Sequence, residues 1–242
     1  MNIKDLKQII DNYKPSDATG EILRSIPINV VAGPTSSGKN TVIKELLKTG
    51  QFFNITTFTT RLPRTNKGVL EKDGVDYYFI NETQALEMVK KQEFIELALV
   101  HDVIYGTAIS EFIKASKTSQ QALLDVDIQG VRSYFRQTSN IKVIFLLPPS
   151  LEEIINRYFN RQLSEVNGED LRIRLASSIK ELEEFLNKDY FYPITSLSIT
   201  ESTEQVLQII NSKTKPKKDP QSIKLAKTLI SEIKQYLNSY ED

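Results

Sequence analysis

The chain of 242 residues contains no cysteine. This absence excludes disulfides and thiolate metal sites, and it agrees with a reducing compartment. Long apolar runs are also missing, since the longest, over 143–147, falls far short of the roughly 20 residues of a membrane helix. The first residues carry scattered charges where a signal peptide has a continuous apolar stretch. We therefore expect a soluble, cytoplasmic protein with no membrane partner.

The chain also lacks net charge, because 31 lysine and arginine residues balance 31 aspartate and glutamate residues. No whole-protein field exists to attract nucleic acid or anionic lipid, so any basic site must be local. The length and an apolar fraction of 40% suffice for one catalytic domain with tails. Neither quantity bears on the oligomeric state.

Short apolar runs alternate with segments of helical periodicity. Strands are expected at 28–32, 122–126 and 142–147, and helices at 41–47 and 131–135. This alternation predicts an α/β fold with a mostly parallel sheet flanked by helices.

Both ends of the chain lie outside the alternating part. Residues 1–26 predict an N-terminal helical extension, and 213–242 predict a charged linker with an amphipathic helix over 223–237. The main domain is therefore expected over 27–212. The last helix either packs on its own domain, which is the more common arrangement, or faces a partner.

A glycine-containing loop joins the first predicted strand to the first predicted helix. Gly33, Gly38 and Lys39 match the phosphate-loop pattern G-x-x-x-x-G-K, in which backbone N–H groups and the lysine surround phosphate oxygens. A surface turn with two glycines is the alternative. The expected ATP-binding residues are Gly33, Pro34, Thr35, Ser36, Ser37, Gly38, Lys39, Asn40 and Thr41.

Asn40 departs from the pattern, which has serine or threonine at this position to bind Mg²⁺. An asparagine carbonyl is also a hard oxygen ligand. Asp125 and Asp127 lie two apart at the end of a predicted strand, where they point to one side and where open α/β sheets place ligands. Asn40 and Asp125 are therefore the expected ligands of Mg²⁺ bound with ATP. The alternative for the aspartates is a cap of the next helix.

Six further segments occur in a fixed order. With the number of their first residue, they are TFTTRLPR (57), GVDYYF (74), EFIE (93), YGT (105), LDVDIQG (124) and PPS (148). Together with the phosphate loop, they make the chain resemble the guanylate kinase family over about 28–210. The resemblance implies a P-loop NTPase fold with a mostly parallel central sheet, a small GMP-binding part over 58–110 and a mobile lid over 157–173. It also implies transfer of the γ-phosphate of ATP to GMP in purine nucleotide metabolism.

The residue chemistry also fits GMP. Arginines and tyrosine hydroxyls hold a dianionic phosphate through charge-assisted hydrogen bonds. Guanine offers N–H donors that carboxylates can read, whereas the N1 of adenine is an acceptor. Solvated arginines and core aromatics are the alternatives. The expected GMP-binding residues are Thr57, Arg61, Arg64, Tyr77, Glu96, Tyr105, Thr107 and Asp127. By resemblance, Glu96 and Asp127 face the base edge, and Thr57 and Thr107 bond the base through their hydroxyls.

Phosphoryl transfer depends on positioning and charge neutralisation, so arginines that close over phosphates are the expected catalysts. The expected catalytic residues are Lys39, Arg157, Arg161 and Arg174. Ordinary surface arginines are the alternative. The lid departs from the family pattern at Gln162, and the loop over 65–73 is longer than in the family.

Two other functions remain open for this fold. A catalytically weak or inactive guanylate-kinase-like binding module is favoured by Asn40 and the altered lid, but it would not need the charges of Lys39, Arg61 and Arg64. A kinase of the same fold acting on a sugar phosphate would not need guanine-reading carboxylates. The sequence favours the GMP kinase.

Overall fold

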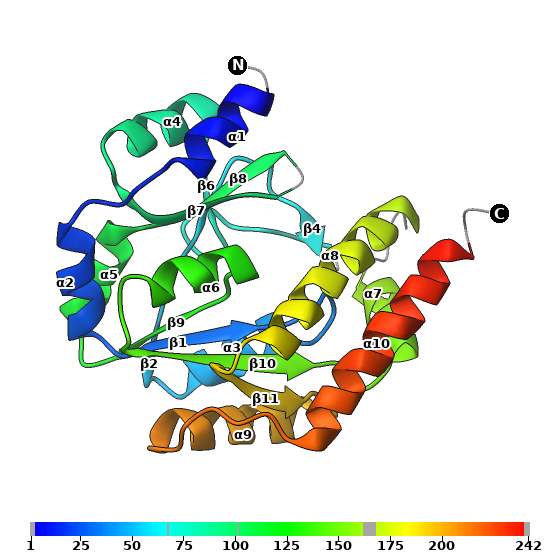
Figure 1. Ribbon diagram of the computed structural model, residues 1–242. Coiled ribbons are helices and arrows are strands. Elements are labelled where there is room, and N and C mark those ends of the chain that lie inside the picture. The colour runs from blue at the N-terminus through cyan, green and yellow to red at the C-terminus, as the bar shows by residue number, and fades with distance from the viewer. Residues whose placement is uncertain (1–2, 67, 101, 162–167, 240–242) are drawn as a thin grey trace. The chain divides into compact units, whose positions relative to one another are not determined.

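The computed structural model describes residues 3–66, 68–100, 102–161 and 168–239 (Figure 1). The fold is α/β with a mostly parallel central sheet flanked by helices, which confirms the predicted fold class. Contacts divide the chain into two compact units. The first unit comprises Met1–Ile28, Gly50–Leu124 and Gln129–Ile141, and the second comprises Asn29–Thr49, Asp125–Ile128 and Lys142–Asp242.

The second unit is built on strands that are buried along their length. Its strands are β1 (Ile28–Ala32), β10 (Ile141–Leu147) and β11 (Phe191–Thr195), which are neighbours in the order β11-β10-β1. All five residues of β1 and the last five of β10 are buried, as expected for strands covered on both faces. β10 and β11 pair in parallel, with Leu147 opposite Thr195. The helices of this unit are α3 (Lys39–Lys48), α7 (Leu151–Arg161), α8 (Gly168–Asn187), α9 (Ile199–Asn211) and α10 (Pro220–Asn238).

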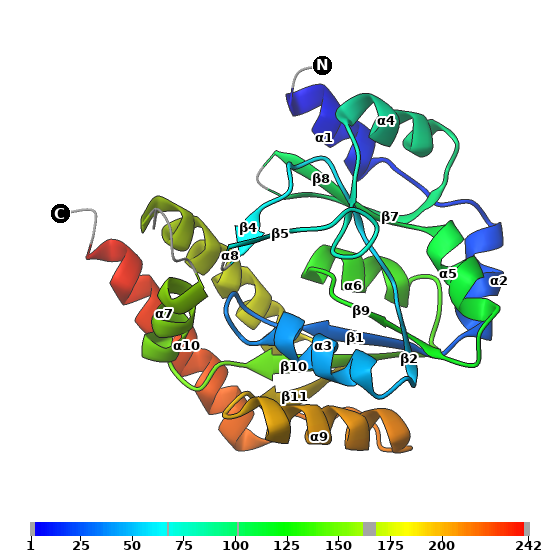
Figure 2. The same ribbon diagram turned by 180° about the vertical axis from the view of Figure 1, so that it is seen from behind.

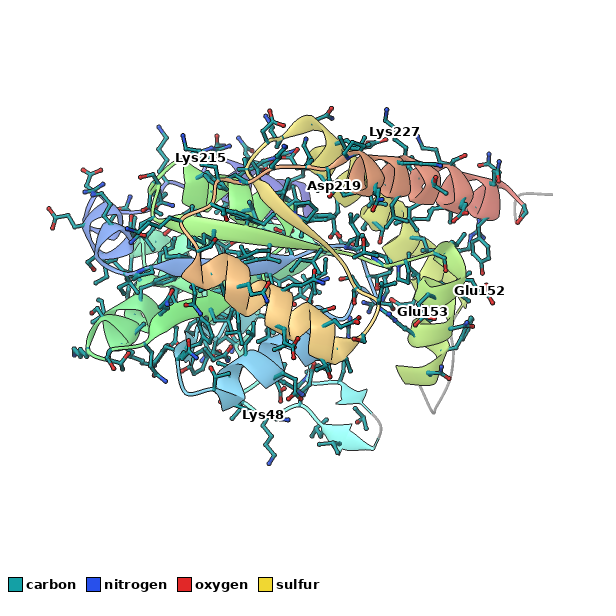
Figure 3. The ribbon with its side chains drawn as sticks, turned by 90° about the horizontal axis from the view of Figure 1, so that it is seen from below. Lys48, Glu152, Glu153, Lys215, Asp219 and Lys227 are labelled. Atoms are coloured by element: carbon teal, nitrogen blue, oxygen red, sulfur yellow. The ribbon has the colours of Figure 1, made fainter. Side chains whose placement is uncertain are left out.

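The C-terminal helix α10 packs on its own unit, where it lies along α8 (Figures 1 and 2). Ala226, Leu229 and Ile233 on its inner face are fully buried. Asp219 lies directly before the helix (Figure 3) and caps it, because its carboxylate accepts hydrogen bonds of 2.9 Å from two backbone N–H groups of the first turn. Lys218 donates to the Phe185 and Leu186 carbonyls at the end of α8. Of the two predicted arrangements, the helix therefore adopts the one packed on its own domain.

The first unit combines a parallel strand pair with a mixed sheet. β2 (Phe52–Asn54) pairs in parallel with β9 (Gln121–Leu124). The mixed sheet has the order β6-β3-β8-β7, in which β6 and β3 pair in parallel and the other neighbours are antiparallel. The strands of that sheet are β3 (Phe58–Thr59), β6 (Tyr78–Phe79), β7 (Phe94–Val100) and β8 (Val103–Ala108). Between β3 and β6 in the sequence, β4 (Thr65–Asn66) and β5 (Val69–Leu70) form an antiparallel hairpin. The helices are α1 (Ile3–Asp11), α2 (Ala18–Ser25), α4 (Glu82–Lys90), α5 (Ile109–Ser116) and α6 (Ile128–Phe135).

The N-terminal extension docks on this first unit. Leu6 and Ile10 of α1 share a buried cluster with Ala85 of α4, and the two helices lie side by side in both views (Figures 1 and 2). The Tyr13 hydroxyl donates to the Phe94 carbonyl at 2.6 Å and accepts from the Phe94 N–H at 3.0 Å. Burial raises the pKa of Tyr13 to about 12, although the bond to Phe94 opposes this rise. The extension is thus tied to the start of β7.

One predicted strand ends earlier than expected. The apolar run over 122–126 predicted a strand through Val126, but β9 ends at Leu124 and the two aspartates lie in the loop that follows. The side-chain alternation of a strand therefore does not explain their orientation. Among the described residues, no helix is long and apolar enough to cross a membrane.

Candidate active site

The phosphate loop connects β1 to α3 in the second unit. Gly33 has φ 140°, and a Cβ atom there would collide with the Leu146 carbonyl of the neighbouring strand. Gly38 has φ 94° at the start of α3. These backbone conformations disfavour other residues, so the glycines of the sequence pattern are required by the loop geometry.

Two side-chain hydroxyls of this loop lack hydrogen-bond partners. The buried hydroxyl oxygens of Ser36 and Ser37 have no hydrogen-bond partner among the described residues. Lys39 Nζ donates to the loop's own carbonyls, to Gly33 O at 2.6 Å and Pro34 O at 3.1 Å. Buried hydroxyls without partners cost free energy, which a bound anion can relieve. The residues present therefore fit a bound phosphate chain.

A cavity of about 100 Å³ adjoins the loop. The loop after β9 contributes Asp125 and Asp127 to its wall, so the structure brings both aspartates to Lys39. Glu181 of α8 lines the same cavity. Asn40 is exposed and does not line it, so the two expected metal ligands are not brought together at this cavity. Among the described residues, no three acidic or histidine side chains are grouped closely enough to hold a metal ion.

Sequence reasoning missed Glu181. Its Oε2 atom is buried and has no hydrogen-bond partner among the described residues. Burial raises the pKa of Glu181 to about 7, with Lys39 opposing the rise and the two aspartates adding to it. Helical spacing was the sequence signal that could have found Glu181, because residues 174, 178 and 181 share one face of α8. The structure shows that this face meets the phosphate loop, since Ser178 accepts a hydrogen bond of 3.2 Å from the Thr35 N–H.

The raised pKa predicts how Glu181 affects stability. Burial raises the pKa of this carboxyl from its ordinary value of 4.5 to about 7 in the folded chain. Its contribution to stability is therefore fully present below about pH 4.5 and is lost as the pH rises through about 7. We expect Glu181→Gln to melt close to the wild type at pH 5 and at least about 2 °C higher at pH 8.

Thermal melts of the nucleotide-free protein in EDTA measure this difference. Glu183→Gln, an exposed change on the same helix, is the matched control and should show little dependence on pH. A Glu181→Gln difference that stays constant from pH 5 to pH 8 would contradict the buried, proton-holding carboxyl.

The arginines expected to act as a lid are engaged with the protein. Arg157 donates to Glu153 at 2.7 Å, and its other nitrogens reach Ser196 O at 2.8 Å and Ser36 O at 3.4 Å. Glu153 lies in the first turn of α7 (Figure 3). Arg157 thus connects α7 to the phosphate loop and to the end of β11.

Arg174 donates to Asp170 at 2.7 Å, and this carboxylate also accepts from the Tyr158 hydroxyl at 2.7 Å. The side chain of Arg161 and the lid residues 162–167 lie outside the described residues. Of the three lid arginines, the structure therefore places Arg157 and Arg174, both on the phosphate-loop unit.

The first unit contains three of the four residues expected to read guanine, whereas the fourth, Asp127, belongs to the second unit and lines the cavity beside Lys39. Glu96 of β7 and Thr107 of β8 face each other across the antiparallel pair, and both are buried. Thr107 Oγ1 donates to Glu96 Oε1 at 2.7 Å. Between them in sequence, Gly106 must lack a Cβ because its space is filled by the Phe94 and Leu97 side chains. Thr57 is buried just before β3.

Arg61 is held by a residue that sequence reasoning also missed. Its NH1 and NH2 donate to the two carboxylate oxygens of Glu71 at 2.5 and 2.9 Å. The guanidinium lies 4.7 Å from the ring centre of Tyr77, and the Arg61 side chain is only 8% exposed. Burial raises the pKa of Glu71, but the hydrogen bonds from Arg61 and from the Arg64 N–H outweigh it and leave the pKa lowered. Glu71 is therefore ionised and holds Arg61 in place.

The other residues expected at the GMP phosphate lie around this pair. Tyr105 contacts Tyr77 edge to face, with ring centres 6.1 Å apart. The Arg64 backbone N–H donates to Glu71 at 2.8 Å, and its side chain is exposed. Glu71 lies in the longer loop after Arg64, and no motif marked it as functional. The first unit thus presents Arg64, Tyr77 and Tyr105 around the fixed Arg61–Glu71 ion pair.

Comparisons with known proteins agree on one family. The family model described as guanylate kinase matches residues 26–213. A guanylate kinase of Clostridioides difficile is 36% identical over 76% of this chain and 86% of its own length. One from Rickettsia prowazekii is 32% identical over 76% of this chain and 89% of its own length. The crystal structure of guanylate kinase from Anaplasma phagocytophilum aligns with a TM-score of 0.59 and 26% identity, covering 78% of this chain and 87% of that one.

Proposed function

The chain belongs to the guanylate kinase family, and from that premise we infer that it transfers the γ-phosphate of ATP to GMP, giving ADP and GDP. The observation that carries this function is that the same chain contains two features. One is a phosphate loop with two unpartnered hydroxyls, and the other is the buried hydrogen-bonded pair of Glu96 and Thr107. The loop suits phosphate, and the pair suits the N–H edge of guanine.

We propose that residues 33–41 bind the ATP phosphates. Backbone N–H groups and the hydroxyls of Ser36 and Ser37 donate to phosphate oxygens, which gives the two hydroxyls the hydrogen bonds that they lack. Lys39 exchanges the Gly33 and Pro34 carbonyls for phosphate oxygens, and a charged acceptor makes a stronger bond than a neutral one.

Members of this family generally use Mg²⁺ with ATP. When bound, the ion neutralises charge on the transferring phosphate. We propose that Asp125 holds it directly or through water and that Asn40 offers its side-chain carbonyl oxygen, since both are hard oxygen donors. The exposure of Asn40 leaves its side chain free to reach a ligand.

Replacing Asn40 by serine tests this role. We expect Asn40→Ser to keep or raise kcat and to lower the Mg²⁺ concentration needed for half-maximal activity, because a short hydroxyl is the ordinary ligand at this position. A titration of Mg²⁺ at fixed ATP and GMP measures the change. Asn156→Ser, an exposed change on α7, serves as control. An unchanged titration for Asn40→Ser would remove Asn40 from the metal site.

We propose that the first unit binds GMP. Glu96 accepts from the N–H groups of guanine, with Thr57 and Thr107 as further base contacts. Asp127, which belongs to the second unit, stays a predicted base contact. Two arginines and two tyrosines surround its phosphate: Arg61, Arg64, Tyr77 and Tyr105. Residues 58–110 then form the GMP-binding part of a main domain over 27–212. Residues 1–26 and 213–242 are its extensions, which pack on the first and the second unit respectively.

The transfer itself requires no protein nucleophile. A GMP phosphate oxygen forms a bond to the γ-phosphorus while the bond from that phosphorus to the β,γ-bridging oxygen breaks. We propose that Lys39, Arg157, Arg161 and Arg174 stabilise the charge that spreads over the phosphoryl oxygens, with 157–173 as the lid. Because Arg157 also bonds the Ser36 carbonyl, it couples the lid helix α7 to the loop.

A coupled assay of ADP release tests the function. GMP, dGMP and AMP are compared at saturating Mg²⁺ with a reaction that contains no acceptor. We expect rapid release with GMP and little with AMP, because the N1 of adenine would place an acceptor against Glu96. Release that is absent, or that does not depend on GMP, would contradict the proposed reaction and favour a binding module.

A further inference from the structure

The strand β7 is irregular just before Glu96, the carboxylate proposed to read guanine. Phe94 pairs with Ala108 of β8. Glu96, two positions further on, pairs with Thr107, which is only one position away from Ala108. The extra residue on β7 is Ile95, which marks a β-bulge. A bulge re-aims the side chains beside it, so the conformation of this bulge sets the direction of the Glu96 side chain.

Side chains from outside the sheet bond the backbone of this bulge. β7 is the last strand in the order β6-β3-β8-β7, so one side of it has no neighbouring strand. The Tyr13 hydroxyl donates to the Phe94 carbonyl at 2.6 Å and accepts from the Phe94 N–H at 3.0 Å. Gln137 Nε2 donates to the Ile95 carbonyl at 3.1 Å. Both bulge residues are almost fully buried, where backbone groups without partners cost free energy. Tyr13 therefore takes the place of a neighbouring strand at Phe94.

Both contacts lead back to the N-terminal extension. Tyr13 follows α1 in this extension. The buried Thr19 hydroxyl shares its proton between Gln137 Oε1 at 2.9 Å and the Ser16 carbonyl at 2.6 Å. All of these residues belong to the first unit. The extension precedes residues 26–213, the part of the chain that the family model matches, so these contacts come from a segment outside that part.

We propose that the N-terminal extension is a specificity element of the guanine site, with Tyr13 as a positioning residue: its two bonds to Phe94 hold the bulge in the conformation that directs Glu96 toward guanine. This inference rests on the proposed role of Glu96 in GMP binding. Tyr13 acts through the Phe94 backbone and not through contact with the nucleotide. An extension that only covered apolar surface would need Leu6 and Ile10 but not the Tyr13 hydroxyl.

Tyr13→Phe removes the hydroxyl and keeps the ring. We expect KM for GMP to rise about five- to tenfold, the size of one hydrogen bond to a buried group, with kcat and KM for ATP nearly unchanged. IMP has the N1–H of guanine but lacks its N2 amine, so a displaced Glu96 costs it fewer contacts. The preference for GMP over IMP in kcat/KM should therefore fall.

Hydrogen–deuterium exchange measures the bulge directly and needs no nucleotide. In Tyr13→Phe the Phe94 N–H loses its acceptor, so peptides that cover 93–97 should exchange about tenfold faster than in the wild type. Peptides from β10, in the second unit, should keep their wild-type rates. Unchanged exchange over 93–97 would overturn the inference, because the hydroxyl would then not hold the bulge.

Tyr192→Phe is the matched control. It also removes a tyrosine hydroxyl that donates to a backbone carbonyl, Thr214 O at 2.8 Å, but in the second unit. We expect it to leave the GMP to IMP ratio and the exchange of 93–97 unchanged. Thermal melts of both variants report any loss of stability separately from the ratio.

Gln137→Met tests the same bulge through its second contact. It removes the amide that bonds the Ile95 carbonyl and leaves Tyr13 in place, so it should lower the GMP to IMP ratio and speed exchange over 93–97. Gln120→Met is its control, since this exposed amide donates to the Gly50 carbonyl at 2.9 Å. If Tyr13→Phe and Gln137→Met both speed exchange but keep the wild-type GMP to IMP ratio, the extension only stabilises the strand and the inference is wrong.

Glu96→Gln separates the inference from its premise. We expect it to weaken GMP use by about ten- to hundredfold. An unchanged KM for GMP in Glu96→Gln would refute the proposed guanine site. In the Glu96→Gln background, Tyr13→Phe should have little further effect on KM for GMP, and full additivity would overturn the inference. If Glu96→Gln weakens GMP use while Tyr13→Phe keeps the GMP to IMP ratio, the guanine site stands and the role of Tyr13 is refuted.

Discussion

Lys39→Met is expected to lower kcat by about a thousandfold, with a smaller effect on the apparent affinity for ATP. Methionine keeps the apolar stem and removes the ammonium group. The charge matters most in the transition state, when negative charge spreads over the transferring oxygens. Among the residues that the structure describes, the ammonium donates to two loop carbonyls and forms no salt bridge, so the substitution breaks no ion pair there. Steady-state kinetics with varied ATP separate kcat from KM.

Lys48→Met provides the control for this first result. Lys48 lies at the other end of the same helix α3 (Figure 3), where it makes an exposed pair with Glu45. Exposed pairs contribute little, so Lys48→Met should keep wild-type kinetics and stability. If Lys39→Met keeps kcat within about threefold of the wild type, the assignment of Lys39 to the transferring phosphate is wrong.

The second large effect is expected at Arg61. Arg61→Ala should lower kcat/KM for GMP by roughly a hundredfold to a thousandfold and leave KM for ATP nearly unchanged. Two losses combine in this change. A phosphate-binding cation disappears, and Glu71 is left as an unpaired carboxylate where the dianionic GMP phosphate is expected. Arg136→Ala, an exposed change in the same unit, is the control.

A double-mutant cycle with Glu71→Gln separates these two losses. Glu71→Gln alone should weaken GMP use less than Arg61→Ala, because the guanidinium stays in place and keeps its contact with Tyr77. In the Arg61→Ala background, Glu71→Gln should restore part of the lost activity by removing the unpaired charge. Simple additivity of the two changes would show that the Arg61–Glu71 pair does not matter for GMP.

Some of this protein can be read locally from its sequence. The strand over 28–32 is predicted to its last residue, because a fully buried strand is a continuous apolar run. The phosphate loop follows from Gly33, Gly38 and Lys39, since its geometry depends on neighbouring residues. The end of β9 at Leu124 was not predictable from the apolar run, because strand pairing and not hydrophobicity ends the strand.

The missed residues share a physical reason. Glu71 pairs with Arg61, which lies ten positions away in the sequence. Glu181 lines the same cavity as Lys39, although the two residues are far apart in the sequence. Neither residue carries a motif, and as isolated residues they resemble surface carboxylates. Only burial and partners distinguish them.

The sequence by itself determined which chemistry to expect of this protein: a loop that accommodates phosphate, basic and phenolic side chains predicted to hold a second phosphate, and carboxylates predicted to read guanine. These features depend on residue types at short spacings, which the chain states directly. Only the tertiary structure decided which charges are already paired, which hydroxyls lack partners, and that both terminal helices pack on the protein itself. Burial and long-range contacts set those properties, and they arise only when distant segments fold together.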